Sequence, residues 1–484
     1  MSADAQLEQV LQRALESFKA RVAASGGVIA VAYSGGLDSA ALLYLAASYA
    51  NRIAGTRVIA LHVHHGLVPQ ADSWLTHCRA QADALAVTFD ARQIQLNTAG
   101  DGIEAAARAA RYAALGEMCR AHGAALLLTA HHLDDQAETV LLQLLRGAGV
   151  AGLSGMDQAN TSAALLGDPT LLMVRPLLAV ARASLAKFVA QAGIAYVDDP
   201  SNAEPRFARN ALRLNVMPTL AANFPGYQTR LARTATHAQS AQRLLIALAR
   251  EDLQRCAVGA TLDIPKLKEL GDDRSDNLLR YWFAERGLRM PSTAWLDELR
   301  AQLFGAKSDA QLCVSHPDCH VRRHRDRVLI TPRHDAAEAA LAELREQITD
   351  AVREGIAAER RPGQIDFVWR GEPVLAFPDL GGSLYFEPAA QGIAADWLAG
   401  QSLQIGLRTG GERLKLAANR PTRAIKYHYQ AAGVPAWERL RLPIVRAGEQ
   451  VLFAAGVGMD CHHAAACGPT AVQLRWAFRQ ADTQ

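Results

Sequence analysis

Closely spaced cysteine pairs are missing from this chain. Its 484 residues include seven cysteines, and no two of them have CxxC spacing. So few cysteines in so long a chain do not make a disulfide framework. Two Cys/His groups, at 313–320 and 461–467, do not have the usual two-pair zinc spacing, so we interpret both as structural.

Long apolar runs are missing as well. None is long enough to span a membrane, and segment 1–24 has the pattern of a charged amphipathic helix rather than a signal peptide. We therefore expect a cytoplasmic protein with no membrane partner. Repeats and low-complexity tracts are absent, and 51 Lys and Arg residues nearly balance 48 Asp and Glu residues, so the net charge says little about partners.

The most informative stretch that is present is Ser-Gly-Gly-Leu-Asp-Ser at 34–39. Apolar segments at 28–33 and 40–45 predict a buried strand before it and a helix after it. Two glycines at such a turn let an anion approach the unpaired N–H groups of the helix start, where the helix dipole is positive. The predicted nucleotide-binding residues are Ser34, Gly35, Gly36, Leu37, Asp38 and Ser39, with Asp38 placed to reach a phosphate-bound Mg²⁺.

A plain glycine turn with Asp38 as a helix cap is the simpler interpretation of this stretch. Its position favours the phosphate site, because an open parallel sheet binds ligands at the carboxyl ends of its strands. The spacing matches neither the Walker motif nor the dinucleotide fingerprint.

Strand and helix patterns alternate through the first half of the chain. Apolar runs predict further strands at 57–66, 86–89, 124–130 and 173–178. Helices are predicted between them at 70–85, 102–122, 134–146 (capped by Asp134) and 184–192. Such alternation is typical of an α/β fold with a doubly wound parallel sheet.

Half of the residues are hydrophobic, and the length suits two to four globular domains. We predict a nucleotide-binding catalytic domain at 1–222. A mainly helical domain with a charged connector is predicted at 223–364, because helical patterns dominate there. From 365 to 484, short strands separated by Gly and Pro turns predict a small α+β domain.

A second polar cluster, His-His-Leu-Asp-Asp-Gln-Ala-Glu-Thr at 131–139, follows the predicted strand 124–130. Asp134 and Glu138 are four residues apart and share a helix face, and the cluster meets the 34–39 loop at one sheet edge. Its carboxylates can bind Mg²⁺ or orient an amine, and its histidines can contact substrate or transfer protons. A capping box with surface acids explains the same residues equally well. Histidines 62, 64, 65, 131 and 132 suit substrate contacts better than a tetrahedral zinc site.

Arginines recur near these clusters. Arg111 follows the i,i+4 pair of Glu104 and Arg108 on a predicted helix, where it either faces solvent or neutralises phosphate charge. Three more basic segments, at 206–213, 321–327 and 408–426, suit contacts with an RNA backbone, or are solvated surface. The residues predicted to bind RNA are Arg206, Arg322, Arg323, Arg408, Arg413, Lys415, Arg423 and Lys426.

With these clusters in place, the sequence resembles the tRNA(Ile)-lysidine synthetase family of the PP-loop ATP pyrophosphatase superfamily. The loop SGGLDS alone would indicate only the superfamily. The resemblance continues through VHHGL at 63–67, EAAARAARY at 104–112, HHLDDQAETVLLQLLRGAG at 131–149 and RPLL at 175–178. It extends through the segment 198–213 to RTGGERLKL at 408–416 and PAWERLRLPIV at 435–445. The middle domain matches only in helical character.

The resemblance implies an ATP-dependent ligase that modifies the wobble cytidine of the CAU anticodon of tRNA(Ile). ATP adenylates the C2 oxygen of the cytosine and releases pyrophosphate, and the side-chain amine of L-lysine then displaces AMP, which changes decoding from AUG to AUA. ATP with Mg²⁺, lysine and the tRNA are the implied substrates and partners. The implied catalytic residues are Asp38, Arg111, His131, Asp135, Glu138 and Arg209, with Asp135 and Glu138 handling lysine and magnesium.

Two rival interpretations belong to other classes. A PP-loop tRNA thiolase would share the first domain but needs cysteines near the site, usually in CxxC pairs. A non-catalytic RNA-binding protein would be expected to have lost the site acids, yet Asp38, Asp134, Asp135 and Glu138 are present. The sequence leaves open whether the chain forms a homodimer and how it distinguishes tRNA(Ile) from tRNA(Met).

Overall fold

The computed structural model describes residues 3–64, 66, 70–94, 103–198, 208–306, 312–333, 343, 346–347, 363–463, 466–467 and 471–478. The chain divides into two compact units, Met1–Glu251 and Asp252–Gln484. Each unit has its own hydrophobic core. Among the described helices, none combines the length and the apolarity needed to cross a membrane.

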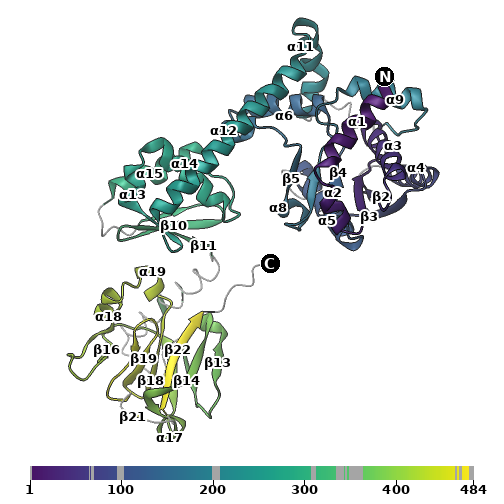
Figure 1. The fold of residues 1–484 in the computed structure, drawn as a ribbon. Helices are drawn as coiled ribbons and strands as arrows, with labels where there is room; N and C mark the ends of the chain where they lie inside the picture. The colour runs from purple at the N-terminus through teal and green to yellow at the C-terminus, as the bar shows by residue number, and fades with distance from the viewer. Residues whose placement is uncertain are drawn as a thin grey trace. The chain divides into compact units, whose positions relative to one another are not determined.

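The first unit is built on a six-stranded sheet with the order β3-β2-β1-β4-β6-β5 (Figure 1). Its strands are β1 (Val28–Ala32), β2 (Arg57–His64), β3 (Thr88–Gln93), β4 (Leu126–Leu128), β5 (Ala159–Thr161) and β6 (Leu172–Val174). Its helices are α1 (Ala3–Glu16), α2 (Lys19–Ala24), α3 (Leu37–Arg52), α4 (Ala71–Ala84), α5 (Ile103–Ala121), α6 (Leu133–Leu145), α7 (Val150–Leu153), α8 (Ala163–Leu166), α9 (Arg182–Ala192), α10 (Ala208–Ala211), the π-helix η2 (Leu212–Val216), α11 (Met217–Asn223) and α12 (Tyr227–Cys256).

Both faces of this sheet are covered, as a doubly wound fold requires. Side chains alternate between the faces of a strand, and in β1 Ile29 and Val31 pack into one core with α1, α3 and α9. Val28 and Ala30 pack into a second core with α5 and α8 on the other face. The alternation of predicted strands and helices along the sequence therefore predicted the layers correctly.

The sheet is mostly rather than entirely parallel. β1 pairs in parallel with β2 and β4, and β4 with β6, but β5 pairs with β6 in the antiparallel sense. The predicted parallel sheet is confirmed for most of the strands but does not include the antiparallel edge strand β5. β5 consists of Ala159, Asn160 and Thr161, which are too few and too polar to produce a strand pattern.

The second unit begins with an antiparallel sheet of order β7-β8-β11-β10-β9. Its strands are β7 (Ala257–Val258), β8 (Thr261–Asp263), β9 (Cys313–Ser315), β10 (Cys319–His324) and β11 (Arg327–Pro332), packed with α13 (Ile264–Glu269), α14 (Asp272–Ala284) and α15 (Thr293–Gly305). Helices α12 to α15 make up most of the described residues between 223 and 333, so the prediction of mainly helical character is confirmed. The sheet was only partly anticipated: the basic segment 321–327 was expected to be a strand region and lies in β10 and β11, whereas the two- and three-residue strands β7, β8 and β9 leave no periodic signal.

The remainder of the second unit is α+β, as predicted, with mainly antiparallel strands. One sheet has the order β12-β15-β18-β19-β20, and a second contains β13, β14 and β22. The strands are β12 (Gln364–Phe367), β13 (Val374–Phe377), β14 (Gly382–Ala394), β15 (Leu403–Leu407), β16 (Arg413–Leu414), β17 (Arg423–Ala424), β18 (Pro443–Ala447), β19 (Gln450–Ala454), β20 (Gly458–Met459), β21 (Ala466–Cys467) and β22 (Ala471–Phe478). The helices are the 3₁₀ turn η4 (Pro378–Leu380), α17 (Ala395–Ala399), α18 (Ile425–Ala431) and α19 (Ala436–Arg439).

Substitution of Gly116 in α5 tests how tightly this helix packs on α8. Replacing a glycine inside a helix by alanine normally stabilises the protein by about 1 kcal/mol. Here a Cβ would lie 1.9 Å from the carbonyl oxygen of Leu166. Gly116→Ala should therefore destabilise the protein by about 1–3 kcal/mol through overpacking. Urea unfolding measures this, and Gly305→Ala, in a helix with open space around the site, is the control expected to show no loss.

Candidate active site

The 34–39 loop connects β1 to α3 as predicted. Gly35 has a φ of 89°, and a Cβ there would lie 2.7 Å from the sulfur of Cys78, so only glycine fits. Gly36 is the N-cap of α3, and its carbonyl oxygen accepts from the N–H of Ala40 at 2.9 Å. The hydroxyls of Ser34 and Ser39 lie 3.1 Å apart. This geometry presents the first N–H groups of α3, together with two hydroxyls, to an anion.

Asp38 lies in the first turn of α3 between two cationic side chains. One carboxylate oxygen, Oδ2, is 3.7 Å from Nε2 of His132 and 3.5 Å from Nε of Arg182. Burial favours a higher pKa for Asp38, but the hydrogen bonds and charges of His132 and Arg182 lower the pKa below its usual value. The other oxygen, Oδ1, is buried and has no hydrogen-bond partner among the described residues. Asp38 is therefore a carboxylate with one oxygen available.

His132, and not Asp134, caps α6. Its Nδ1 accepts from the N–H of Asp135 at 3.3 Å, and Oδ2 of Asp135 accepts from the N–H of His132 at 3.1 Å. The predicted cap at Asp134 was wrong, because the carboxylate of Asp134 accepts instead from the N–H of Arg182 at 2.8 Å and from Gln228 at 3.3 Å. Asp134 therefore connects α6 to α9 and α12.

The two neighbouring histidines have opposite pKa shifts. Burial lowers the pKa of His132, but Asp38, Asp135 and Asp134 outweigh it, and the net shift is upward. Burial together with the charges of several arginines, Arg175 and Arg108 foremost, lowers the pKa of His131 to about 3. His131 is therefore neutral at physiological pH, where its Nδ1 forms a 2.9 Å hydrogen bond with the hydroxyl of Thr129. It can contact substrate but does not carry a proton as an imidazolium.

Glu138 is buried beneath two arginines rather than exposed at the crevice. Its side chain is 2% exposed. Oε2 accepts from Nε of Arg209 at 2.8 Å and from Nη2 of Arg213 at 2.9 Å, and Oε1 accepts from Nε of Arg213 at 2.8 Å. Both carboxylate oxygens are thus bound to guanidinium groups, which contradicts a direct role for Glu138 in binding the lysine amine.

Arg213 was missed by the sequence analysis, although it stands in the family block RFARNALR. It lies in the π-helix η2, which directly follows the α10 turn that carries Arg209. Single π turns inside helices are frequent at functional sites. Nη2 of Arg213 also lies 3.5 Å from Oδ1 of Asp135, so this guanidinium links the buried Glu138 to the cleft.

A cleft of about 670 Å³ lies where β1, β2 and β4 end. Its volume is typical of a small-molecule site. Among the predicted residues, it is lined by Ser34, Gly36, Leu37, Asp38, Ser39, Arg111, His131 and Asp135. Arg182, Arg213, Trp74 and Tyr196 line it too and were not predicted. A signal for Arg182 existed: an arginine in the first turn of a helix is unfavourable for the helix dipole and needs another reason to be there.

The predicted RNA-binding residues have different environments. Arg413, Arg423 and Lys426 are exposed, Lys415 and Arg408 are half-buried, and Arg206 lies outside the described residues. Arg322 is half-buried, and its guanidinium lies 5.3 Å from the ring of Trp437. Arg323 is 6% exposed and donates to the carbonyl oxygens of Leu303, Ala306 and Arg325. We therefore withdraw Arg323 as an RNA contact, since its guanidinium caps carbonyl groups at the C-terminal end of α15.

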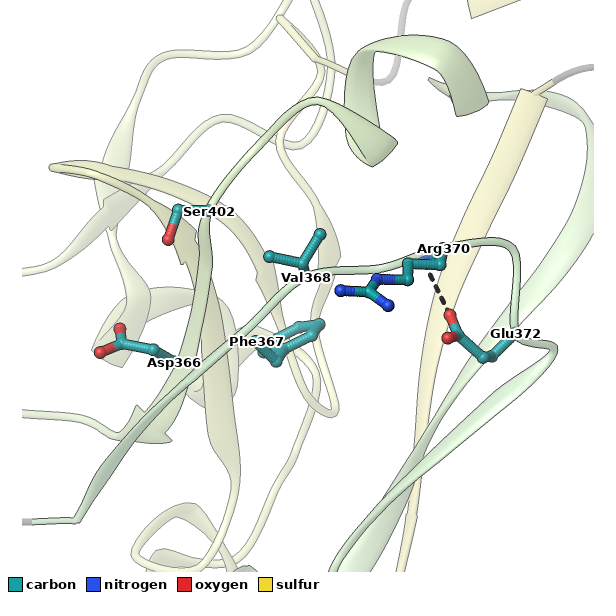
Figure 2. A pocket seen from close by; sticks show the side chains of 6 residues that line it. All are labelled: Asp366, Phe367, Val368, Arg370, Glu372 and Ser402. Atoms are coloured by element: carbon teal, nitrogen blue, oxygen red, sulfur yellow. Dashed lines mark hydrogen bonds between the residues drawn. The ribbon is translucent and has the colours of Figure 1, made fainter.

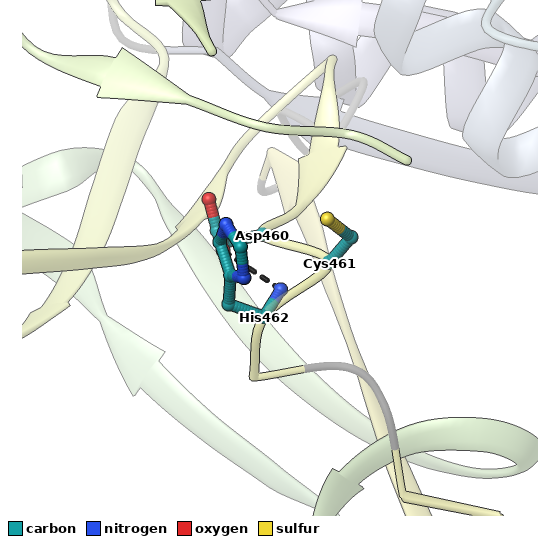
Figure 3. A group of neighbouring side chains, drawn as sticks. All are labelled: Asp460, Cys461 and His462. Atoms are coloured by element: carbon teal, nitrogen blue, oxygen red, sulfur yellow. Dashed lines mark hydrogen bonds between the residues drawn. The ribbon is translucent and has the colours of Figure 1, made fainter. Parts of the chain in front are cut away.

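Two other candidate sites, both in the second unit, are not organised like the cleft of the first unit. Figure 2 shows a surface pocket lined by Asp366, Phe367, Val368, Arg370, Glu372 and Ser402, in which the backbone N–H of Arg370 donates to Glu372. Figure 3 shows Asp460, Cys461 and His462, a turn whose ligand atoms lie within 4.8 Å of one another. Both oxygens of Asp460 already accept from backbone N–H groups, of Lys415 and His462, so this carboxylate shapes the turn.

Family models match most of the chain. Residues 4–220 match a PP-loop domain, residues 262–329 a TilS substrate binding domain, and residues 403–476 a TilS substrate C-terminal domain. Solved structures give weaker likenesses: a U34-tRNA thiolase from Methanococcus maripaludis has a TM-score of 0.40 at 15% identity and covers 47% of this chain and 78% of its own. A TilS C-terminal domain has a TM-score of 0.21 and covers 24% of this chain and 99% of its own. These two scores are too low to support an argument.

Curated relatives extend over nearly the full length. The tRNA(Ile)-lysidine synthase of Ralstonia nicotianae is 43% identical over 464 residues, 94% of each chain. That of Burkholderia pseudomallei is 44% identical over 449 residues, 89% of each chain. The thiolase alternative is thereby set aside. The chain belongs to the tRNA(Ile)-lysidine synthase family and is an ATP-dependent ligase that modifies tRNA(Ile).

Proposed function

We propose that the cleft of the first unit carries out both steps of lysidine formation. In the first step ATP adenylates the C2 oxygen of the wobble cytidine, and in the second the amine of L-lysine displaces AMP. The observation that carries this proposal is the meeting of an anion-binding helix start with carboxylates in one cleft. The phosphates and the amine have opposite charges and need opposite surroundings.

Phosphate binding falls to the 34–39 loop and nearby arginines. The N–H groups at the start of α3 and the hydroxyls of Ser34 and Ser39 suit the pyrophosphate that leaves. Arg111 and Arg182 also line the cleft, where they stabilise the charge that develops during transfer. A neutral His131 is then free to contact the base without adding charge.

Magnesium fits at Asp38. The unpartnered Oδ1 is a hard oxygen ligand of the kind that Mg²⁺ prefers, and the lowered pKa of Asp38 keeps the carboxylate ionised. When bound there, the ion would neutralise phosphate charge and polarise the phosphoryl oxygens. Asp38 itself holds its charge at the start of α3, with Oδ2 oriented by His132 and Arg182.

Lysine handling is assigned to Asp135. In α6, Asp134 bonds to α9 and α12, and both oxygens of Glu138 are bound by arginines away from the cleft. Asp135 lines the cleft, and its arginine contacts are longer, with Oδ1 3.5 Å from Arg213 and 3.8 Å from Arg209. A lysine amine has a pKa of about 10.4 in water and must lose a proton before it attacks. The carboxylate of Asp135 can bind the ammonium group and accept a proton from it. Glu138 positions Arg209 and Arg213 and does not touch the substrate.

Asp38→Ala should abolish ATP-dependent adenylation while the fold persists, because the carboxylate serves the metal and the phosphates. The expected loss is about 10²-fold or more, the scale of several kcal/mol of charge stabilisation. The measurement is the release of pyrophosphate from ATP in the presence of tRNA(Ile), with circular dichroism as the check on folding. Asp38→Asn, of the same shape, should fail equally. Normal turnover by a folded variant would contradict the assignment.

Asp135→Asn should block the second step more than the first. Without the carboxylate, lysine loses its anchor and its proton acceptor, but the phosphate contacts stay in place. Trapping of adenylated tRNA from labelled ATP without lysine measures the first step, and incorporation of labelled lysine measures the overall reaction. The ratio of the two should shift at least about 10-fold toward the trapped intermediate. An equal loss in both assays would remove lysine handling from Asp135.

Glu138→Gln should slow both steps together. The neutral amide leaves two guanidinium groups without their buried counter-ion, so Arg209 and Arg213 move from their positions. A displacement of about 1 Å costs on the order of 10²-fold in rate. The same two assays measure this, and Glu138→Asp, which keeps the charge, should recover part of the activity. A selective loss of lysine transfer would restore a direct substrate role for Glu138.

A further inference from the structure

Three arginines of the second unit have no carboxylate partner. Arg325, Arg408 and Arg439 form no ion pair with any described Asp or Glu. Their charges act on one another, since the pKa of Arg439 is lowered first by burial and then by Arg408 and Arg325. The nearby Glu412 carboxylate pairs instead with Arg446 at 3.1 Å. Among the described residues, the three therefore form a positive cluster in which no arginine is paired with a carboxylate.

Each of the three is held in place by neutral groups. Nη2 of Arg325 donates to the carbonyl oxygen of Gln430 at 3.0 Å, and Nε of Arg439 donates to that of Val434 at 2.7 Å. The guanidinium of Arg408 lies 5.4 Å from the ring centroid of Tyr429. Neutral acceptors and an aromatic ring orient these groups but leave their charge available for a ligand.

Arg325 occupies a backbone conformation that favours glycine. It lies in the two-residue turn between β10 and β11, with a φ of 54°. Tight hairpin turns with positive φ usually contain Gly, Asn or Asp, and another residue there costs on the order of 1 kcal/mol or more. An arginine in this costly conformation points to a use for its side chain beyond the turn itself.

Buried donors without a partner among the described residues lie in the cluster and near its Arg325 end. The hydroxyl of Tyr429, which is 0% exposed, has no such partner, and neither has Nε of the Arg408 that lies over its ring. Nε1 of Trp437 is a third such donor, and the Trp437 ring lies against His324, the residue before Arg325. Burial raises the pKa of Tyr429 to about 12, so its hydroxyl remains a donor. Unsatisfied buried donors are costly and uncommon in native proteins. Buried donors without acceptors, beside cations without a paired carboxylate among the described residues, point to an anion as the ligand.

We propose that Arg325, Arg408 and Arg439 bind one backbone phosphate of the tRNA. Guanidinium groups match phosphate oxygens in pairs, and three of them outweigh a single phosphate charge. Arg325 lies in the segment that matches the substrate binding domain, and Arg408 and Arg439 lie in the segment that matches the C-terminal domain. One phosphate would therefore connect both segments. The inference rests on the proposed tRNA contacts of the 408–426 region, which are tested separately below.

The first test compares tRNA binding with stability. Arg408→Gln, Arg439→Gln and Arg325→Asn remove one charge each, and asparagine tolerates the positive φ of residue 325. Affinity for tRNA(Ile) transcripts is measured from about 50 to 200 mM salt, where the triple variant, which loses the one phosphate contact, should reduce the slope of log K against log salt by about 0.7–0.9. Each single variant should weaken binding with a smaller change of slope. ATP binding should not change. The free variants should unfold at the same or a higher temperature, because repulsion is relieved.

The controls separate this site from general basic contacts. Arg370→Gln removes an exposed arginine of the same unit and should alter neither slope nor stability. Gln substitutions of Arg413 and Lys426 test the wider basic surface. An effect of those two alone would overturn the three-arginine site, whereas no effect of any variant would also remove the proposed tRNA contacts. Thermal stabilisation by inorganic phosphate that Arg439→Gln abolishes, with unchanged tRNA slopes, would reassign the site to a free anion.

Discussion

The pairing of the buried carboxylate of Glu138 with Arg209 and Arg213 supports the organisation of the active site. Three hydrogen bonds of 2.8 to 2.9 Å join α6 to α10 and η2, which are about seventy residues apart in sequence. An acidic residue that is only 1% exposed needs such partners, because a buried polar group without them is costly. Arg213 then lies beside Asp135, whose capping bonds fix His132 next to Asp38. The proposed lysine end and the proposed phosphate end of the cleft thus belong to one charged network.

This network explains how adjacent residues acquire different chemistry. His131 and His132 are adjacent residues with the same imidazole side chain. Arginines surround His131, however, whereas carboxylates surround His132. The three acids of α6 diverge likewise: Asp134 joins helices, Asp135 faces the cleft and Glu138 orients arginines. Environment therefore distributes structural, binding and positioning roles within eight consecutive residues.

Arginines fall into two groups in this protein. Those with a carboxylate or several carbonyl partners, such as Arg213 and Arg323, serve the architecture of the site or of the fold. Those without an acid partner among the described residues, such as Arg408 and Arg439, carry charge that no described carboxylate pairs with. For an enzyme whose substrate is a polyanion, the second group is the one to examine for binding, because affinity for nucleic acid depends on charge left available.

Local patterns in the sequence were enough to determine the nucleotide-binding half of the protein. The apolar strand, the glycine turn of 34–39 and the alternation that follows are short-range signals, and they predicted the sheet layers and the phosphate loop. The resemblance in the 131–139 and 198–213 blocks also marked Asp135, Glu138 and Arg209 as site residues. What each one does was decided by the tertiary structure. Whether a carboxylate contacts substrate or an arginine depends on which side chains from distant parts of the sequence lie beside it. Neither the burial of Glu138 nor the charge of Arg439, unpaired among the described residues, has a signature in residue spacing. The physical reason is that contacts between segments far apart in the chain set the electrostatic environment of each side chain.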